Sequence, residues 1–414
     1  MQPFSSSLTS SPSSSQTNPV ILQAVATARP PRVTIRTATS GTDALRQELA
    51  NVAEPAAKSG SIFSDIYITT TGPATRSATP QAAIPPDTPL LLAAANGDTA
   101  GVLALLRAGA EVNRARADGA TALMSAAQDG HKGCVLLLIQ AGARVGQADG
   151  MDWTALMFAT QGGHTGTVEV LLRAGAQAGQ AKSDGFTVLM VAAQHGHTDT
   201  VQALLHAGAQ PDQAMRDGWT GLMSAVESGH AETAKLLIRA GARVDQCRSN
   251  GRTVLMVAAQ NGRTATVQAL LAAGAAIDQA DHGGWTAVIA AAQDGYPDTV
   301  KALIDAGAAF DRPMPDGWTA LMAAAQDGHT SVLEVLLRAG ARPDQAMPNG
   351  WTALMSAAQD GHAATVQVLL EAGASYERKC VAGATAMSMA IAGEHTEVIQ
   401  LLRARGAVRP EATS

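Results

Sequence analysis

The chain has 414 residues, which is too long for one ordinary globular core, so we expect several cores or one core shared by many small units. Hydrophobic residues make up 46% of the chain and aromatic residues only 3%, which predicts a core of Ala, Leu, Val and Met. The formal net charge of −6 and the absence of a long run of Lys or Arg argue against nucleic acid as a partner.

Cysteine spacing argues against a zinc-bound or disulfide-linked protein, and hydropathy argues against a membrane-spanning one. Cys134, Cys247 and Cys380 are far apart, and no Cys or His pair has the spacing of a zinc site or of a disulfide framework. The thiols fit a reducing compartment, and we expect no metal and no cofactor. No apolar run approaches about 18 residues, so no membrane span is expected.

Residues 1–84 differ in composition from the rest of the chain. Serine dominates Ser5 to Ser15, and residues 1–28 contain no acidic or basic side chain. Such a segment cannot bury enough apolar surface to fold alone, which predicts a largely disordered, Ser-rich tail. A secretory signal peptide needs a charged start and a solid apolar stretch, and an organellar transit peptide needs early arginines, whereas the first basic residue is Arg29.

This Ser-rich, acid-poor composition resembles the N-terminal secretion signal of type III effectors from Gram-negative bacteria. The alternative is a tail without an address. Within it, Asp43 to Glu54 has the pattern of a short amphipathic helix, and Ile62 to Thr71 alternates like a strand. Under the export hypothesis a secretion chaperone would bind this region; otherwise the helix would pack beneath the first repeat.

From residue 88 onward, one threonine returns every 33 residues. Ten units without an insertion or deletion predict one structural module stacked ten times, because any slip would break the contacts between neighbours. The anchoring residues are Thr88, Thr121, Thr154, Thr187, Thr220, Thr253, Thr286, Thr319, Thr352 and Thr385.

Each unit is predicted to contain two helices and a loop. In unit 2, Ala122 to Asp129 forms a two-turn helix closed by Gly130, a residue that tolerates the left-handed conformation. In unit 4, Thr198 to His206 has apolar residues at i, i+3 and i+4, the pattern of a second helix. The pair Asp217-Gly218 marks a turn in the loop, with too few apolar neighbours to build a sheet.

Small and large residues alternate between the two helices. Paired alanines in the first helix allow neighbouring backbones to approach, at Ala126-Ala127, Ala192-Ala193, Ala324-Ala325 and Ala357-Ala358. Paired leucines in the second helix are predicted to fill the space between units, each contributing roughly 1.5 to 3 kcal/mol if buried. They are Leu171-Leu172, Leu204-Leu205, Leu270-Leu271, Leu336-Leu337 and Leu369-Leu370.

The 33-residue period, the Thr-x-Leu that opens the first helix, the Gly-His between helices, the paired leucines and the closing Gly-Ala resemble the ankyrin repeat over Asp87 to Val408. The resemblance implies an all-α ankyrin-repeat solenoid of ten helix-turn-helix units with hairpin-like loops at residues 85–408, followed by a disordered C-terminus at 409–414. Arg403 replaces a leucine in the last unit, where a polar outer face is expected.

The chain also departs from the family pattern. Only the first unit keeps the proline of the usual Thr-Pro-Leu-His, and methionine replaces the histidine in most units, so we expect apolar packing there in place of a polar link. These residues are Met124, Met157, Met190, Met223, Met256, Met322 and Met355.

No catalytic motif was found. The sequence contains no phosphate-binding loop, HExxH pair, Gly-x-Ser-x-Gly elbow or kinase-like set. Asp and His recur together, as in Asp129 and His131, but a catalytic constellation would be unique. We expect no catalytic residue and predict that the recurring histidines lie between the two helices and bond the backbone: His131, His164, His197, His230, His329 and His362.

The residue before each anchoring threonine is often aromatic, and these side chains are predicted to point outward in a stripe: Trp153, Phe186, Trp219, Trp285, Trp318 and Trp351. With neighbouring units about 8 to 10 Å apart, Trp285 to Trp351 would form a ladder. The resemblance places this position at the base of the loop on the concave, partner-binding side. Alternatively, each tryptophan only covers its own loop.

Glutamine and aspartate recur at the end of the first helix, and the resemblance places them on the same concave surface. Aromatic anchors beside adaptable polar groups suit a protein interface. Because the stripe is interrupted at Ala120 and Arg252, the main contact zone is predicted at Trp285 to Trp351, with orienting residues Gln293, Asp294, Gln326, Asp327, Gln359 and Asp360.

These observations predict a monomeric, non-enzymatic module that binds a protein partner along the concave surface. The uniform surface favours an extended or repetitive partner. With the tail, the chain fits a type III secreted effector that acts on a host protein inside a host cell. The alternative is a cytoplasmic scaffold or inhibitor that is not exported.

Overall fold

The computed structural model describes residues 88–406. By its internal contacts the chain divides into two units, Met1–Thr79 and Pro80–Ser414, and all described residues belong to the second. The predicted tail at residues 1–84, its short helix and strand, and the segment 409–414 lie outside the described residues.

The described residues form twenty helices in ten pairs, and they contain isolated β-bridges but no strand. The all-α prediction is therefore confirmed. The first helices are α2 (Pro89–Ala95), α4 (Ala122–Gln128), α6 (Ala155–Gln161), α8 (Val188–Gln194), α10 (Gly221–Glu227), α12 (Val254–Gln260), α14 (Ala287–Gln293), α16 (Ala320–Gln326), α18 (Ala353–Gln359) and α20 (Ala386–Ala392). The second helices are α3 (Thr99–Arg107), α5 (Lys132–Gln140), α7 (Thr165–Arg173), α9 (Thr198–His206), α11 (Ala231–Arg239), α13 (Thr264–Ala272), α15 (Pro297–Asp305), α17 (Thr330–Arg338), α19 (Ala363–Glu371) and α21 (Thr396–Ala404).

The anchoring threonine begins every first helix as its N-cap. Its Oγ1 accepts a hydrogen bond from the backbone N–H three residues later, at 3.1–3.5 Å, in all ten units. This bond satisfies one of the N–H groups that a helix start leaves without a partner. The 33-residue period of the sequence is therefore the period of helix initiation.

The turn between the two helices is tied to the next unit by a histidine. Gly130 has φ 71°, and a Cβ there would meet His164 Nδ1 of the next unit at 2.4 Å, so only glycine fits. His164 Nε2 lies 3.0 Å from the backbone oxygen of Gln128. Equivalent contacts of 2.8–3.0 Å are made by His131, His197, His230, His362 and His395.

The prediction that the histidines bond backbone is thus confirmed, and the structure adds that the acceptor belongs to the preceding unit. His329 differs, because its Nε2 is buried and has no partner among the described residues.

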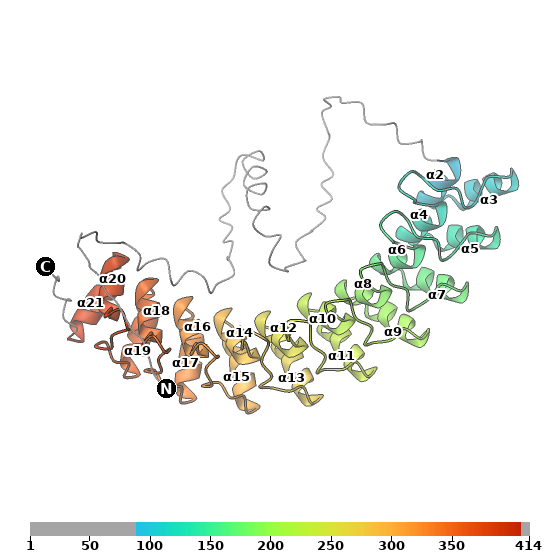
Figure 1. The fold of residues 1–414 in the computed structure, drawn as a ribbon. Coiled ribbons are helices and arrows are strands. Elements are labelled where there is room, and N and C mark those ends of the chain that lie inside the picture. Colours follow the sequence, from blue (N-terminus) through green and yellow to red (C-terminus); the bar gives the residue numbers. More distant parts are fainter. Residues whose placement is uncertain (1–87, 407–414) are drawn as a thin grey trace, which may run out of the picture. The chain divides into compact units, whose positions relative to one another are not determined.

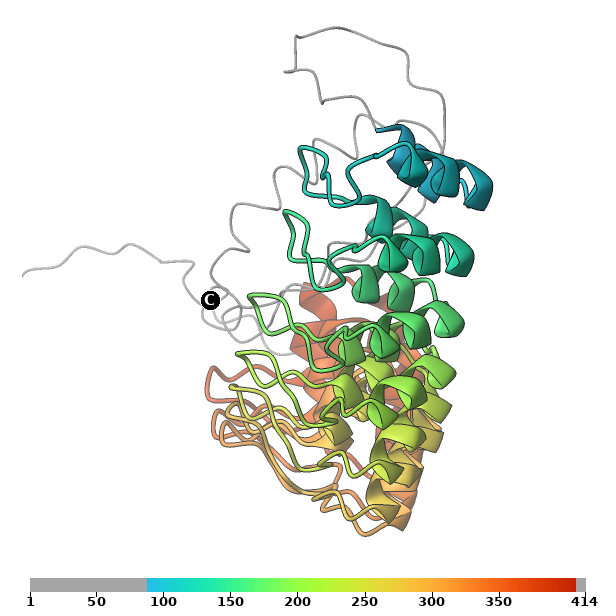
Figure 2. The ribbon, with the colours of Figure 1, turned by 90° about the vertical axis from the view of Figure 1, so that its right-hand side faces the viewer.

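The units stack with like helices in contact. Each first helix packs against the first helices of its neighbours, and each second helix against the neighbouring second helices. Within residues 88–406, the first helices follow the inner side of a curved path and the second helices its outer side (Figure 1). The loops project together from one side of the stack (Figure 2).

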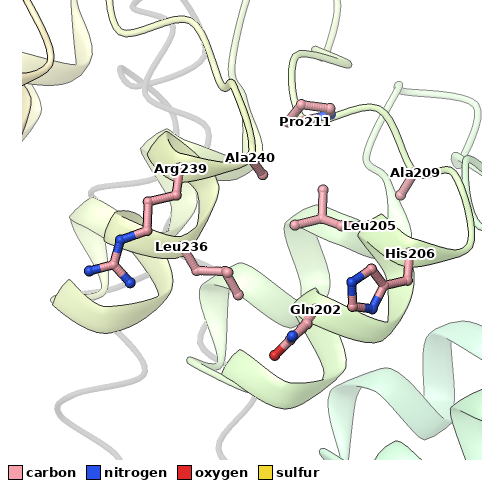
Figure 3. Close-up of a pocket in the computed structure, with 8 residues that line it drawn as sticks. All are labelled: Gln202, Leu205, His206, Ala209, Pro211, Leu236, Arg239 and Ala240. Carbon is pink, nitrogen blue, oxygen red and sulfur yellow. The ribbon is translucent and has the colours of Figure 1, made fainter.

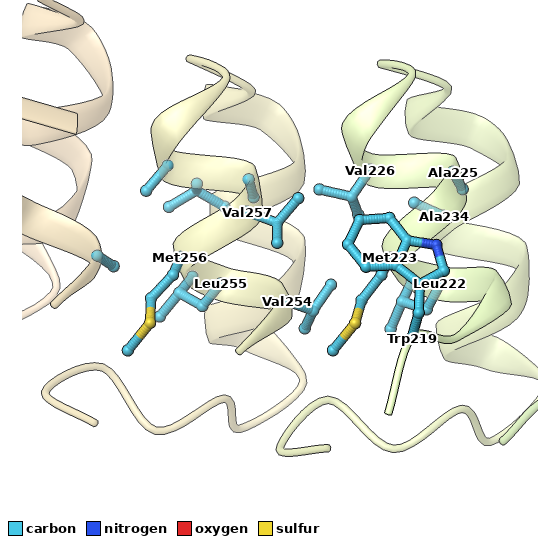
Figure 4. Packing of buried hydrophobic residues seen from close by; sticks show 14 of the residues in the cluster. Trp219, Leu222, Met223, Ala225, Val226, Ala234, Val254, Leu255, Met256 and Val257 are labelled. Atoms are coloured by element: carbon cyan, nitrogen blue, oxygen red, sulfur yellow. The ribbon is translucent and has the colours of Figure 1, made fainter. Parts of the chain in front are cut away.

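The core runs through all ten units as one cluster. The paired alanines are fully buried, and the seven methionines at the histidine position are at most 2% exposed, as the sequence predicts. Figure 4 shows this packing between α10 and α12. The prediction for the leucine pairs is correct for the first member, which is buried, but wrong in four units for the second. Leu172, Leu205, Leu271 and Leu337 remain partly exposed, because they pack against the core cluster without being enclosed by it.

Arg403 in the last unit is exposed, as expected for the end of a stack. Among the helices of the described residues, none combines the length and the apolar character that crossing a membrane requires.

Candidate functional site

The aromatic residues before the N-cap threonines are held at the base of each loop by a local turn. The backbone N–H of the five tryptophans donates to an Asp or Asn side chain of its own loop, at 2.8–3.0 Å. Such side-chain turns fix the chain just before the helix. Their side chains, however, have different surroundings in different units.

Trp219 contradicts the prediction that the whole stripe points outward. Its side chain is only 3% exposed, and its indole N–H donates to Ser224 Oγ at 2.8 Å. Figure 4 shows it beside Leu222 and Met223 of α10. The guanidinium of Arg248 lies over its ring, 5.0 Å from the centroid. Trp219 is therefore a core residue, because Ser224 accepts its indole N–H and Arg248 covers its ring.

Trp351 makes the same bond, to Ser356 Oγ at 2.8 Å, but remains partly exposed. Trp153 is partly exposed and packs on Phe158 with ring centroids 5.3 Å apart, with Lys182 Nζ 5.9 Å from its ring centroid. Phe186 is also partly exposed.

Trp285 and Trp318 form a distinct pair in adjacent units. Both pack partly against the core and keep part of their surface exposed. Five residues on, where Trp219 and Trp351 find serine, these units have Ala290 and Ala323. Within residues 88–406, neither indole N–H has a hydrogen-bond acceptor. They therefore offer an aromatic surface and a donor that the described chain does not use.

The predicted glutamines and aspartates lie at the ends of the inner helices. Gln293 and Gln326 with Asp294 and Asp327 are partly exposed, whereas Gln359 and Asp360 are exposed. The three aspartates are the C-cap residues of α14, α16 and α18. Each of the helices α14, α16 and α18 therefore has a tryptophan just before its start and polar side chains at its end.

A charged cluster between α10 and α14 was missed by the sequence-based site. Arg248 forms an ion pair with Asp217 at 2.6 Å. Burial lowers the pKa of Arg252, and the neighbouring Arg248 adds to this, while Asp281, Asp294 and Glu227 oppose it. Although Glu227 is exposed as a whole residue, partial burial of its carboxyl raises its pKa, against the attraction of Arg248 and Arg252. The sequence could have indicated this cluster, because Arg252 and Glu227 both depart from the residue that most other units have at the same position.

The outer side has a shallow hollow of about 330 Å³ between α9 and α11. Figure 3 shows Leu205 and Leu236 at its base, with His206 and Arg239 at its rim. Its polar groups do not converge on one point. In the part of the chain that the structure describes, no three His, Cys, Asp or Glu side chains come together as a metal site requires.

Comparison with protein families and solved structures identifies the class of protein. The family described as ankyrin repeats (3 copies) matches residues 75–149, 144–215, 189–281, 255–347 and 339–412, and the chain therefore belongs to the ankyrin repeat family. Ankyrin repeats are protein-interaction modules, so this array is a module that binds protein partners.

Among solved structures, 545 chains match. One is the crystal structure of the human ASB11 ankyrin repeat domain, with 26% identity and a TM-score of 0.50 over 53% of this chain and 98% of that domain. No curated protein matches the chain.

Proposed function

We propose that the chain captures an extended or repetitive partner protein on the inner side of units 7 to 9, with Trp285 and Trp318 as anchors. The observation that carries the proposal is that these two indoles are partly exposed and keep an N–H without an acceptor in residues 88–406. Tryptophans of this kind dominate binding energy at protein interfaces. Trp351 extends the site, and the polar ends of α14, α16 and α18 orient the partner.

The tryptophans can be tested with a matched pair of variants. Replacing Trp285 and Trp318 together by alanine is expected to weaken partner binding by at least about 2 kcal/mol, roughly thirtyfold, because interface tryptophans are typical hot spots. The helical circular-dichroism spectrum should stay unchanged. The control is Trp219→Ala, which removes a core side chain and is expected to lower the unfolding midpoint instead.

Unchanged binding by the Trp285/Trp318 double variant, measured by isothermal calorimetry with a captured partner, would refute this site. A lost helical spectrum would show that the two side chains hold the fold.

We further propose that residues 1–84 direct export through a type III apparatus, so that the module acts on a host protein as a monomer and without catalysis. The uncharged, Ser-rich start supports this proposal. The competing proposal is a cytoplasmic scaffold or inhibitor. A reporter fused to residues 1–84 and assayed in a strain with and without a working apparatus separates them, since retention in both strains favours the scaffold.

A further inference from the structure

The tryptophans of units 7 and 8 differ from those of units 5 and 9 in the use of the indole N–H. In units 5 and 9, a serine five residues later accepts this N–H, at 2.8 Å in each case. Trp285 and Trp318 have Ala290 and Ala323 at that position, and within residues 88–406 neither Nε1 has an acceptor. Because α14 packs against α16, two unused and partly exposed donors lie one unit apart on the inner side.

A glycine leaves the donor edge of Trp285 uncovered. The φ of Gly283 is outside the left-handed region, so the backbone does not require glycine there. A Cβ at Gly283 would lie 3.2 Å from Cδ1 and 3.7 Å from Nε1 of Trp285. Units 8 and 9 have Asp316 and Asn349 at this position. Any larger side chain at Gly283 would therefore crowd the indole N–H, which glycine keeps open to a partner.

Proline rings lie next to both anchors. Pro315 and Pro348 are exposed in the loops of units 8 and 9. The Cδ atom of Pro315 occupies the space that a Cβ of Gly284 would need, and Cδ of Pro348 would lie 2.7 Å from a Cβ of Gly317. Gly284 and Gly317 directly precede the two anchoring tryptophans. The surroundings of the indoles are therefore partly apolar, which suits a partner that is itself apolar.

The spacing of the two donors distinguishes between the regular conformations of a partner chain. Neighbouring units lie about 8 to 10 Å apart. Equivalent residues repeat about every 6.7 Å in a β-strand and about every 5.4 Å in an α-helix, whose carbonyl oxygens are already used internally. A polyproline II helix repeats every three residues, about 9.3 Å, and its carbonyl oxygens have no internal hydrogen bond. Of the three, only the last presents one free acceptor per unit.

We infer that the partner segment held at Trp285 and Trp318 is a proline-rich polyproline II helix. It places one carbonyl oxygen on each indole N–H and its proline rings against the aromatic faces. The inference rests on the proposed function, because it names the partner of the same two anchors. Proline-rich segments already favour this conformation in the free state, so less conformational entropy is lost when they bind. Proline at every third position also gives the partner the period of the units.

The chain itself supplies variants that separate the role of the N–H from that of the ring. Ala290→Ser and Ala323→Ser copy the serine of units 5 and 9, so each new hydroxyl should accept the indole N–H internally and leave the ring in place. Ser356→Ala does the reverse in unit 9, because it frees the indole N–H of Trp351. Tryptophan followed by serine or by alanine already occurs in folded units of this chain.

The probe is a fluorescein-labelled peptide of twelve prolines, which is about 37 Å long as a polyproline II helix and so covers units 7 to 9. Its binding to the full chain is measured by fluorescence anisotropy. The Ala290→Ser/Ala323→Ser variant should bind it about tenfold more weakly than the wild type, and Ser356→Ala about threefold more tightly, as expected for two lost hydrogen bonds and one gained. A twelve-residue peptide of alternating Thr and Gln, which favours a strand, should bind the wild type at least about tenfold more weakly.

The inference and the proposed function fail on different results. No binding of the proline peptide, equal affinity for the two peptides, or equal binding of the proline peptide to the wild type and to Ala290→Ser/Ala323→Ser would overturn the polyproline II partner. The anchors would still stand if a captured partner protein loses affinity for the Trp285→Ala/Trp318→Ala variant. A captured partner that binds this variant as tightly as the wild type would refute both.

Discussion

At the scale of single residues, two glutamates of unit 5 respond to their surroundings in opposite directions. Partial burial raises the pKa of Glu227, and a hydrogen bond from Lys235 lowers the pKa of Glu232. The Lys235 ammonium is 2.8 Å from the Glu232 carboxylate. Because both residues lie in the same unit, they form a matched pair for a test of pH dependence.

We expect Glu227→Gln to raise the urea midpoint at pH 7 and to have no effect well below pH 4.5, the ordinary pKa of glutamate. A raised folded-state pKa means that the folded chain binds the proton more tightly, so stability falls as the pH rises through that value. Removing the carboxylate abolishes this loss. The measurement is the difference in urea midpoint between variant and wild type from pH 3.5 to pH 7.5.

Glu232→Gln is the control with the opposite sign. Its lowered pKa means that the charged form stabilises the fold above pH 4.5, so this variant should be slightly less stable at pH 7, with the difference disappearing toward acid. The effect is small because the pair is exposed and screened. Two variants that shift the midpoint in the same direction at pH 7 would contradict the assigned causes.

Single positions also show which features can be predicted from the sequence and which cannot. The start of each first helix at the threonine and the burial of the methionines follow from local pattern, and both were predicted. The burial of Trp219 depends on Ser224 and Arg248, whose side chains meet it only in the folded unit. Stripe position alone could not separate Trp219 from Trp285. The serine five residues later predicts the indole hydrogen bond of Trp219 and Trp351, but not the burial of Trp219.

At the scale of elements, adjacent loops are joined by a recurring polar tie. An Asp or Asn side chain accepts a hydrogen bond from the backbone N–H of the residue 31 positions later, at 2.7–3.3 Å. The accepting residues are Asn113, Asp212, Asp245, Asp278, Asp311 and Asp344. Units 2 and 3 have Gly146 and Gly179 at this position, so the tie is absent between units 2 and 3 and between units 3 and 4 of the described array. These junctions should open more readily than the others.

Gly179→Asp is expected to restore a tie by accepting from the backbone N–H of Gln210. A Cβ at Gly179 would meet only Gln213 Oε1, at an ordinary 3.6 Å, so the substitution has room. The bond should stabilise the junction by about 1 kcal/mol, measured as slower hydrogen exchange in α7 and α9. Gly179→Ala is the control, since it removes only the backbone freedom of glycine.

Equal exchange in the Asp and Ala variants would show that the tie contributes nothing beyond the loss of glycine. The tie itself is hard to predict from sequence, because its two partners lie in different units and only stacking brings them together. The same is true of the histidines, whose backbone bonding was predicted but whose partner in the preceding unit was not.

At the scale of the whole array, the 33-residue period determines which surfaces repeat. Ten N-caps in register place every first helix on the inner side and every second helix on the outer side of residues 88–406 (Figure 1). The fold could be predicted for this reason, since each contact between units is repeated many times. The site could be predicted only to its row of positions, because what distinguishes Trp285, Trp318 and Arg252 is their individual neighbours.

The central claim is that a partner binds the inner side at units 7 and 8, and hydrogen exchange of the complex tests it most directly. With a captured partner protein bound, the amides at the starts of α14 and α16 and in the loops before them should exchange more slowly, while α9 and α11 beside the outer hollow stay unchanged. Protection confined to α9 and α11, with none at α14 and α16, would contradict the account.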